Sequence, residues 1–203
     1  MFIRKTIISA IVISTLILFP EISFAEAEPG AAAPEQRSQR VRFNELTFSS
    51  GYGWGELKGN DNLEIIPFSV RFGFDINALV GVRGTAELQF GVEPFLNTIV
   101  APEEGVEAGF NVGFRYITPV TDGVSVFGEI SSGPAYLSID TVEQGDGGFN
   151  FISQFGAGLQ FELTRNVALN AGYRFRHLSN AGFSEPNRGI NSDVLLAGIS
   201  FGY

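Results

Sequence analysis

The chain has 203 residues, including 20 Phe, 25 Gly, one His and no Cys, and its formal net charge is -9. Without cysteine the chain has no disulfide, no thiolate nucleophile and no zinc–thiolate site, and a single histidine rules out a multi-histidine metal centre. The negative charge would repel a phosphate backbone, which argues against nucleic-acid binding. Aromatic residues make up 13% of the chain and charged residues 17%, which is not the composition of a disordered protein.

The N-terminus has the pattern of a secretory signal peptide over residues 1–25. Arg4 and Lys5 precede an apolar stretch at 7–19, and Ser23-Phe24-Ala25 has the small-x-small form of a cleavage site. The apolar stretch is shorter than the roughly 20 residues that a membrane-spanning helix needs. Residues 26–40 are polar and rich in Pro and Ala, which predicts a flexible periplasmic leader.

From residue 41 onward, apolar and polar residues alternate with the period of two that is typical of β-strands. The alternation is regular in four segments, residues 66–74, 80–92, 106–116 and 149–163. It is less regular in four others, residues 41–57, 124–137, 167–179 and 192–203. The pattern therefore predicts eight strands.

The composition of the two strand faces distinguishes a soluble fold from a membrane barrel. One face is rich in Phe and Val, and the opposite face carries Gly, Gln, Asn, Arg and Glu. A small barrel in lipid needs this arrangement, with apolar side chains outward and polar side chains inward. Tyr203 ends the last strand on an aromatic residue, which is similar to the C-terminal signature of bacterial outer-membrane proteins. We expect residues 41–203 to form an all-β, eight-stranded antiparallel transmembrane β-barrel in the outer membrane; a soluble lipocalin-like barrel is the structural alternative.

The segments between the strands predict the two ends of the barrel. With the N-terminus in the periplasm, short periplasmic turns are expected near 75–78, 117–123 and 164–166, and longer external connections near 94–104, 139–148 and 180–191. Charged residues on the inward face are expected to form an ion-pair network rather than a channel, because side chains usually fill an eight-stranded lumen. The predicted inward charges are Arg71, Arg83, Glu87, Glu107, Arg115, Glu129, Glu162, Arg174 and Arg176.

The single histidine lies in the seventh predicted strand, residues 167–179. The alternation places His177 and Ser179 on the outward face, and Arg174 and Arg176 on the inward face. The Cα atoms of residues two apart on one face of a strand lie roughly 7 Å apart, so an imidazole can reach a hydroxyl. The pair is predicted near the outer leaflet. The alternative is a polar pair at headgroup level without a catalytic role.

Residues 177–191, HLSNAGFSEPNRGIN, resemble the active-site segment of the PagL family of outer-membrane lipid A 3-O-deacylases. The matching positions are His177, Ser179, Asn180, Ala181, Asn187 and Gly189. The resemblance implies that Ser179 is the nucleophile and that His177 is its base. It further implies an oxyanion hole formed by the Asn180 side-chain amide and the Gly182 backbone N–H, with Asn187 and Gly189 supporting the loop.

One position departs from the family pattern. Where the best-known members carry a Glu that orients the histidine, this chain has Asn191, on the outward face of the neighbouring strand. An Asn can accept the imidazole N–H but cannot neutralise an imidazolium. Asp193, on the same face, and Glu185, in the preceding loop, are the alternative acidic partners.

The resemblance implies a hydrolase that releases a 3-hydroxy fatty acid from the 3-position of lipid A, with lipopolysaccharide as substrate and no cofactor, metal or nucleic acid. Whether the barrel forms a homodimer is open. Two other functions are kept as alternatives: a structural or adhesion barrel with a decayed site, and an outer-membrane phospholipase. Ser200 lies in a G-x-S-x-G pattern, but that motif requires a following helix and the chain ends at Tyr203.

Overall fold

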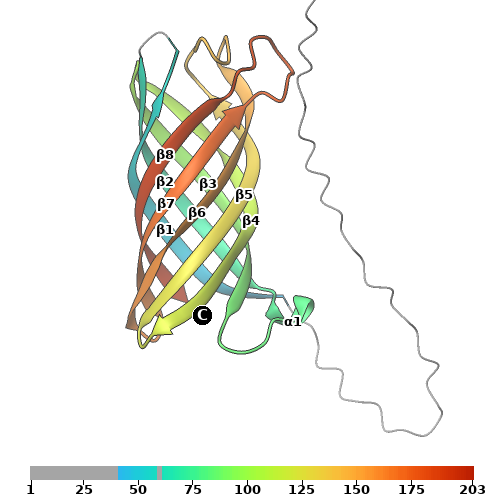
Figure 1. Cartoon of the computed structure of the whole chain (residues 1–203), viewed down its shortest axis with the longest axis vertical. Helices are drawn as coiled ribbons and strands as arrows, with labels where there is room; N and C mark the ends of the chain where they lie inside the picture. Colours follow the sequence, from blue (N-terminus) through green and yellow to red (C-terminus); the bar gives the residue numbers. More distant parts are fainter. Residues whose placement is uncertain (1–40, 59–60) are drawn as a thin grey trace, which may run out of the picture. The chain divides into compact units, whose positions relative to one another are not determined.

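The computed structural model describes residues 41–58 and 61–203, which form a closed β-barrel (Figure 1). The strands are β1 (Arg42–Glu56), β2 (Asn62–Asp75), β3 (Glu87–Ala101), β4 (Gly105–Thr121), β5 (Val124–Leu137), β6 (Gly148–Thr164), β7 (Val167–Ser179) and β8 (Ile190–Gly202). Each strand pairs antiparallel with the next, and β8 pairs with β1 to close the barrel. The prediction of an all-β, eight-stranded antiparallel barrel is confirmed.

The predicted signal peptide (1–25) and leader (26–40) lie outside the described residues. Within the part of the chain that is described, no helix is long and apolar enough to cross a membrane.

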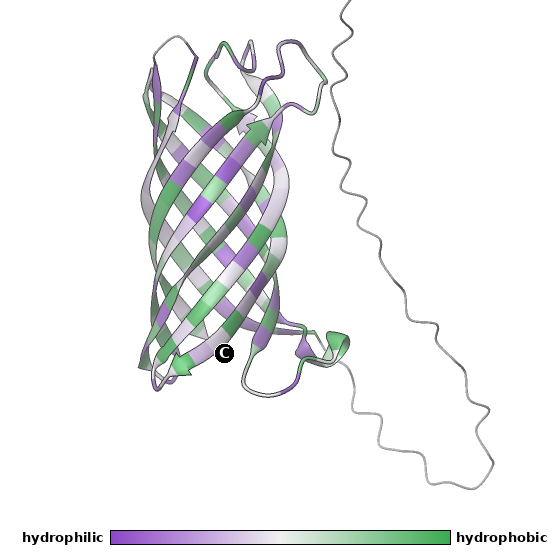
Figure 2. Cartoon of the chain, in the orientation of Figure 1, coloured by the Kyte–Doolittle hydropathy of each residue, from purple (hydrophilic) through white to green (hydrophobic). Residues whose placement is uncertain are grey.

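Hydrophobic and hydrophilic residues alternate along the strands (Figure 2), and the large apolar ones are exposed on the outside of the barrel. In β4, Phe110, Val112 and Phe114 are exposed, whereas the alternate residues Asn111 and Arg115 are buried in the lumen. Successive side chains of a strand point to opposite faces, so this one strand supplies both surfaces. The barrel thus buries polar groups and exposes apolar ones, the inverse of a soluble fold.

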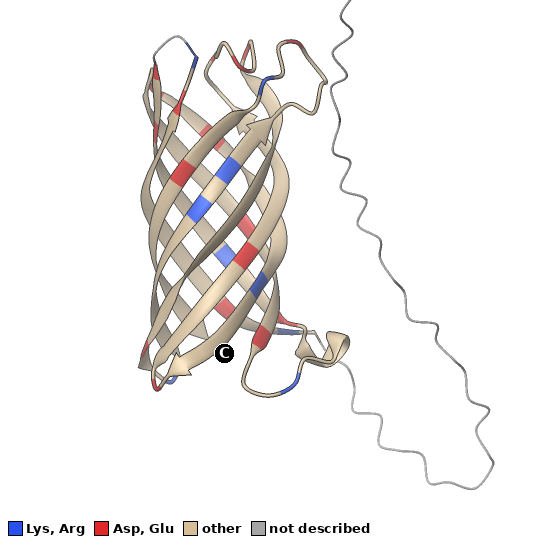
Figure 3. Ribbon diagram, viewed as in Figure 1, with Lys and Arg blue, Asp and Glu red and all other residues tan. Residues whose placement is uncertain are grey.

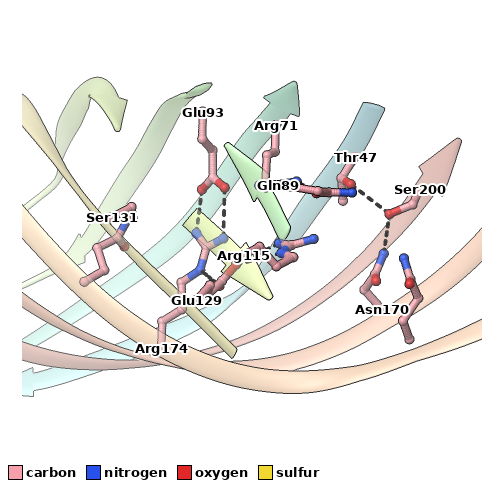
Figure 4. A network of polar contacts seen from close by, with 12 residues as sticks. Thr47, Arg71, Gln89, Glu93, Arg115, Glu129, Ser131, Asn170, Arg174 and Ser200 are labelled. Atoms are coloured by element: carbon pink, nitrogen blue, oxygen red, sulfur yellow. Dashed lines mark hydrogen bonds and ion pairs between the residues drawn. The ribbon is translucent and has the colours of Figure 1, made fainter. Parts of the chain in front are cut away.

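Buried charges fill the middle of the lumen, where acidic and basic positions lie on neighbouring strands (Figure 3). Arg174 lies between Glu93 and Glu129, and its Nη2 is 2.9 Å from Glu93 Oε2 (Figure 4). Arg115 also binds Glu129, at 2.8 Å. The remaining pairs are Arg71 with Glu45, Arg115 with Glu45, and Arg176 with Glu107. This network confirms the predicted interior ion pairs.

One of the predicted inward charges is placed differently: Arg83 is exposed in the connection between β2 and β3. Glu162 is on the inward side, where it lines a pocket with Glu45 and Gln89 at the mouth of the barrel, but it is exposed there and lies outside the network. Glu45 and Glu93 belong to the network but were not predicted, because Glu45 lies in a segment that alternates less regularly and Glu93 lies just beyond the predicted strand at 80–92. Ser200 is buried, and its Oγ lies 2.7 Å from both Thr47 Oγ1 and Asn170 Nδ2 (Figure 4), which agrees with its exclusion as a nucleophile.

The loop end of the lumen is apolar, not polar as the alternation suggested. Its buried core includes Ile65, Ile99, Leu137, Ile152 and Val194. These residues face inward near the β1–β2, β3–β4, β5–β6 and β7–β8 connections, and their outward neighbours are also often apolar. Both faces of the strands are therefore apolar at this end, which weakens the period-two signal.

The predicted strand at 80–92 is wrong in its first half. Residues 77–80 form the short helix α1 (Asn77–Val80), and β3 begins only at Glu87. Asn77 organises this connection, since its side chain donates to the carbonyl of Ala86 at 2.8 Å and accepts from the N–H of Leu88 at 2.7 Å. Gly81 and Gly84 have φ values of 75° and 88°, which break an extended strand.

The predicted external connection at 94–104 is also wrong. β3 continues to Ala101, so the connection spans only 102–104, because Phe95, Asn97 and Ile99 keep pointing into the lumen. Conversely, the predicted short turn at 75–78 is part of a longer connection at 76–86. The expected contrast between short and long connections holds for 138–147 and 180–189 against 122–123 and 165–166, and it fails for these two.

Candidate active site

His177 and Asn191 lie directly opposite each other on β7 and β8, and both are exposed on the outer surface. His177 Nδ1 is 2.7 Å from Asn191 Oδ1. An amide oxygen only accepts hydrogen bonds, so this contact places the imidazole proton on Nδ1. Nε2 then carries the free lone pair, which is the arrangement a general base needs.

The backbone of Gly189 also lies close to the imidazole. Its φ is 72°, in the left-handed region that favours glycine. A Cβ at this position would lie 2.4 Å from His177 Cε1 and 3.1 Å from Nε2, closer than a van der Waals contact allows. The position of the histidine ring is therefore restricted by the hydrogen bond to Asn191 and by the close Gly189 backbone.

Ser179 is the last residue of β7 and lies on the same outward face, two residues beyond His177. It is half-buried and pairs with Phe151 of β6. Among residues 41–58 and 61–203, no hydrogen bond joins Ser179 to His177. Their roots are about 7 Å apart, and catalytic hydrogen bonds commonly tighten only when substrate is bound, so a side-chain rotation can bring them together.

The two acidic candidates do not contact the histidine. The hydroxyl of Tyr173 donates a hydrogen bond to Asp193. Glu185 is exposed in the 180–189 connection, and within the described residues it forms no hydrogen bond to His177. Of the three residues considered for the orienting role, Asn191 is the one that the structure brings to the imidazole.

The two groups predicted to form the oxyanion hole are both engaged inside the loop. The Asn180 side-chain amide donates to the carbonyl and hydroxyl of Ser184, at 3.0 and 2.9 Å, and to the carbonyl of Pro186 at 3.3 Å. The Gly182 N–H donates to Asn180 Oδ1 at 2.9 Å. Asn180 is only 3% exposed. Both donors are therefore bonded within the loop in this structure, and the oxyanion role stays a prediction that requires these hydrogen bonds to rearrange.

The backbone N–H of Asn180 is shared between two acceptors. It donates to Asn187 Oδ1 at 3.1 Å, consistent with a supporting role for Asn187, and to Gln144 Oε1 at 3.0 Å. Gln144 belongs to the 138–147 connection and is almost fully buried. The neighbouring Glu143 accepts the N–H of Arg188 through its carbonyl at 2.9 Å. The β5–β6 connection is thus joined to the β7–β8 connection by two hydrogen bonds, which fix the position of the latter.

Gln144 and Glu143 were not predicted from the sequence. Their segment, TVEQGDGG, has the polar, glycine-containing composition of any surface loop. Nothing in such a segment indicates that two of its polar residues are buried against a loop some 40 positions away. Predicting the role of these two residues would have required knowledge of which loops meet at this end of the barrel.

The barrel and its site define a class: a closed eight-stranded barrel that carries a serine and a histidine–amide pair on its outer face. The sequence matches a family model described as lipid A 3-O-deacylase (PagL) over residues 46–200, which includes every predicted site residue. The chain therefore belongs to the PagL family of lipid A 3-O-deacylases, as the resemblance of residues 177–191 predicted.

The fold is similar to that of solved outer-membrane barrels. The crystal structure of the outer membrane enzyme PagL is 20% identical, with a TM-score of 0.56, covering 76% of this chain and 97% of that one. Neisserial surface protein A is 16% identical, with a TM-score of 0.59, covering 79% and 97%. At these identities the likeness shows the fold alone. No curated protein matches the sequence significantly.

Proposed function

We propose that this chain is an outer-membrane ester hydrolase that removes the 3-O-linked hydroxyacyl chain of lipid A. The observation that carries the proposal is the hydrogen bond from His177 to Asn191, with Ser179 two residues further along the same outward face. Family membership supplies the substrate class. Such a site on the outside of a barrel is useful only for a substrate that arrives from the surrounding membrane.

The outer surface supports a membrane location. Large apolar residues such as Phe68, Phe114, Ile130 and Phe155 are about half exposed or more, on different strands. A continuous apolar surface of this kind would make a soluble protein aggregate, whereas it matches the hydrocarbon of a bilayer. Lipid A would reach Ser179 by lateral diffusion in the outer leaflet.

The proposed reaction has two steps. Ser179 Oγ attacks the ester carbonyl carbon while His177 Nε2 takes the hydroxyl proton. The tetrahedral intermediate collapses, the sugar oxygen leaves, and the imidazolium returns the proton to it. Water, deprotonated by His177, then attacks the acyl carbon of the Ser179 ester; the bond between this carbon and Oγ breaks, the imidazolium returns the proton to Oγ, and a 3-hydroxy fatty acid is released. Asn191 holds the imidazole in the tautomer that the first step needs.

Mass spectrometry of lipid A tests the proposal, using cells that express the protein or Ser179→Ala at matched levels. We expect loss of one hydroxyacyl chain only with Ser179 intact. Unchanged lipid A in both strains would contradict the proposal and would favour a structural or adhesion barrel. Lysophospholipid together with intact lipid A would instead assign a phospholipase activity.

A further inference from the structure

A row of polar side chains crosses the outer surface of the barrel at the level of the histidine. It runs over four neighbouring strands, and each member stands directly opposite the next: Ser132 of β5, Ser153 of β6, His177 of β7 and Asn191 of β8. All four are exposed. Ile130 and Phe155, two positions along β5 and β6, are 63% and 59% exposed. The polar row therefore interrupts an apolar surface.

The two serines of the row need a physical reason, because a hydroxyl in contact with hydrocarbon costs free energy that a methyl group does not. At other small outward positions the chain uses alanine, as at Ala157, Ala171 and Ala197. A serine on this surface is tolerated where a carbonyl satisfies it. Ser50 of β1, for example, donates to the carbonyl of Pro67 at 2.8 Å. Within the described residues, no backbone carbonyl accepts the proton of Ser153.

The contacts of Ser132 fix the direction of the protons in the row. Its Oγ lies 2.9 Å from the carbonyl oxygen of Ile152 and 3.0 Å from Ser153 Oγ. A carbonyl oxygen only accepts, so the single proton of Ser132 goes to Ile152, and the Ser153 hydroxyl donates to Ser132. An ionised acceptor binds a donor about twice as strongly as a neutral one. A negatively charged oxygen beside Ser153 would therefore attract its proton away from Ser132.

Ser153 lies beside both catalytic side chains. Residues directly opposite each other in an antiparallel pair have Cβ atoms about 4.5–5.5 Å apart, and this is the relation of Ser153 to His177. Ser179 is the diagonal neighbour of Ser153, at a Cβ separation of about 7 Å, which one bound carbonyl group can bridge. An ester within reach of Ser179 and His177 thus has the Ser153 hydroxyl on its β6 side.

We propose that the Ser153 hydroxyl donates a hydrogen bond to the oxyanion that forms when Ser179 attacks the ester. The charge of the tetrahedral intermediate collects on the former carbonyl oxygen, and a donor must reach that atom. Ser153 needs only a side-chain rotation, whereas the Asn180 amide and the Gly182 N–H are bonded within the loop. Ser132 then turns its proton from the backbone carbonyl to Ser153 Oγ, which strengthens the donor. This inference rests on the proposed function.

The test compares nitrophenyl decanoate with its thionoester, using the full barrel in detergent. Sulfur replaces the carbonyl oxygen in the thionoester and accepts hydrogen bonds only weakly, so an oxyanion donor contributes much less to its cleavage. Ser153→Ala should lower kcat about 100-fold for the ester, the loss expected for one such donor, and about threefold or less for the thionoester. KM should hardly change, because the donor acts on the transition state.

Three further variants serve as controls, and the change in electrophoretic mobility on heating shows that each is folded. Ser153→Thr keeps a hydroxyl and should retain most of the activity, with the wild-type ratio of the two substrates. Ser132→Ala removes only the supporting hydroxyl, so its loss should be smaller than that of Ser153→Ala. Ser50→Ala removes an outward hydroxyl of β1 and should alter neither rate.

A second measurement does not depend on the thionoester. Decylboronic acid forms a tetrahedral anion with the Ser179 oxygen and so resembles the intermediate. Ser153→Ala should weaken its inhibition of ester hydrolysis about tenfold or more, because the variant lacks the donor to that anion. Inhibition as strong as in the wild type would overturn the inference.

Two kinetic results would also overturn it: an unchanged kcat in Ser153→Ala, or equal losses for the ester and the thionoester. Equal losses would indicate a residue that positions His177 and does not touch the oxyanion. Failure of the proposed function has a different signature, since the wild type would then cleave neither these esters nor lipid A. Where the wild type is active and depends on Ser179, the response of Ser153→Ala decides this inference alone.

Discussion

His177 is confined by two contacts of different kinds, a hydrogen bond to Asn191 and steric contact with Gly189. We predict that Gly189→Ala lowers the rate of ester hydrolysis at least tenfold. The added Cβ would lie 2.4 Å from His177 Cε1, so the imidazole would have to move out of its position. Gly81→Ala is the matched control: its φ is 75°, close to that of Gly189, but a Cβ there meets nothing within 4 Å. The comparison of initial rates separates backbone strain from displacement of the histidine. Equal losses in both variants would refute the role given to Gly189.

Asn191 fixes a tautomer but supplies no negative charge. We predict that Asn191→Leu lowers kcat for a nitrophenyl ester, with about 10⁴-fold as the upper limit seen when the orienting acid of a serine hydrolase is replaced. Asn191→Glu should retain or raise kcat, because a carboxylate also stabilises the imidazolium. The measurement is steady-state turnover, with Asp193→Ala assayed alongside. A loss in Asp193→Ala with none in Asn191→Leu would transfer the orienting role to Asp193.

At the scale of elements, the β7–β8 connection depends on the β5–β6 connection, because Gln144 accepts the N–H of the residue that follows Ser179. We predict that Gln144→Ala loosens the 180–189 connection, so that trypsin cuts faster at the exposed Arg188 and ester hydrolysis slows. Ser138→Ala is the control. Ser138 lies in the same connection as Gln144 and its hydroxyl also accepts a backbone N–H, but from Val106 of β4, at 2.7 Å. Unchanged cleavage at Arg188 in Gln144→Ala would contradict the coupling of the two loops.

The sequence predicted the elements where one face is apolar and the other polar, and it failed where that contrast is lost. The ranges of β5 and β7 match the predicted 124–137 and 167–179, because polar inward residues such as Glu129 and Arg174 stand beside apolar outward residues such as Ile130 and Tyr173. The predicted range of β3 was too early in the sequence for two reasons. Phe95 and Ile99 are apolar residues that face the lumen, which hid the second half of the strand, and Asn77 and the left-handed glycines form a connection where the strand was predicted to begin.

The features of the candidate site also fall into two groups, those that the sequence predicted and those that it did not. The outward direction of His177 and its contact with Asn191 follow from alternation and hairpin register, both of which are local properties of the sequence. The commitment of Asn180 to Ser184 and Pro186, and the help from Gln144, depend on how two loops fold against each other. No periodicity encodes that contact, so the loop geometry had to come from the structure.

At the scale of the whole molecule, stability depends on charges buried in the lumen. Arg174 neutralises Glu93 and Glu129 together. We predict that Arg174→Leu lowers the free energy of unfolding by about 3–5 kcal/mol, since it leaves two buried carboxylates without their shared partner. Arg42→Leu removes the exposed Arg42–Asp75 pair, and we expect a change of about 1 kcal/mol or less. Urea unfolding in lipid vesicles measures both. Similar losses in the two variants would show that burial does not set the strength of these pairs.

The same filling of the lumen predicts that the barrel does not conduct. Within the described residues, the ion-pair network occupies its middle, and the apolar core that contains Ile65, Ile99 and Val194 closes the loop end. Purified protein added to a planar bilayer should give no stable single-channel currents. Steady, ion-selective currents from correctly folded protein would mean that the network leaves an aqueous path.

The closure of β8 on β1 also bears on how the chain could be rewired. The N–H of Tyr203 donates to the carbonyl of Asn44 at 2.9 Å, so the first and last residues of the barrel are neighbours. Joining them and opening the chain at the 122–123 turn, which lies at the same barrel end, would give a circular permutant in which β7 and β8 become internal strands. His177, Ser179 and Asn191 would then be synthesised midway along the chain, which would separate their chemistry from the C-terminal aromatic residue that now ends the barrel.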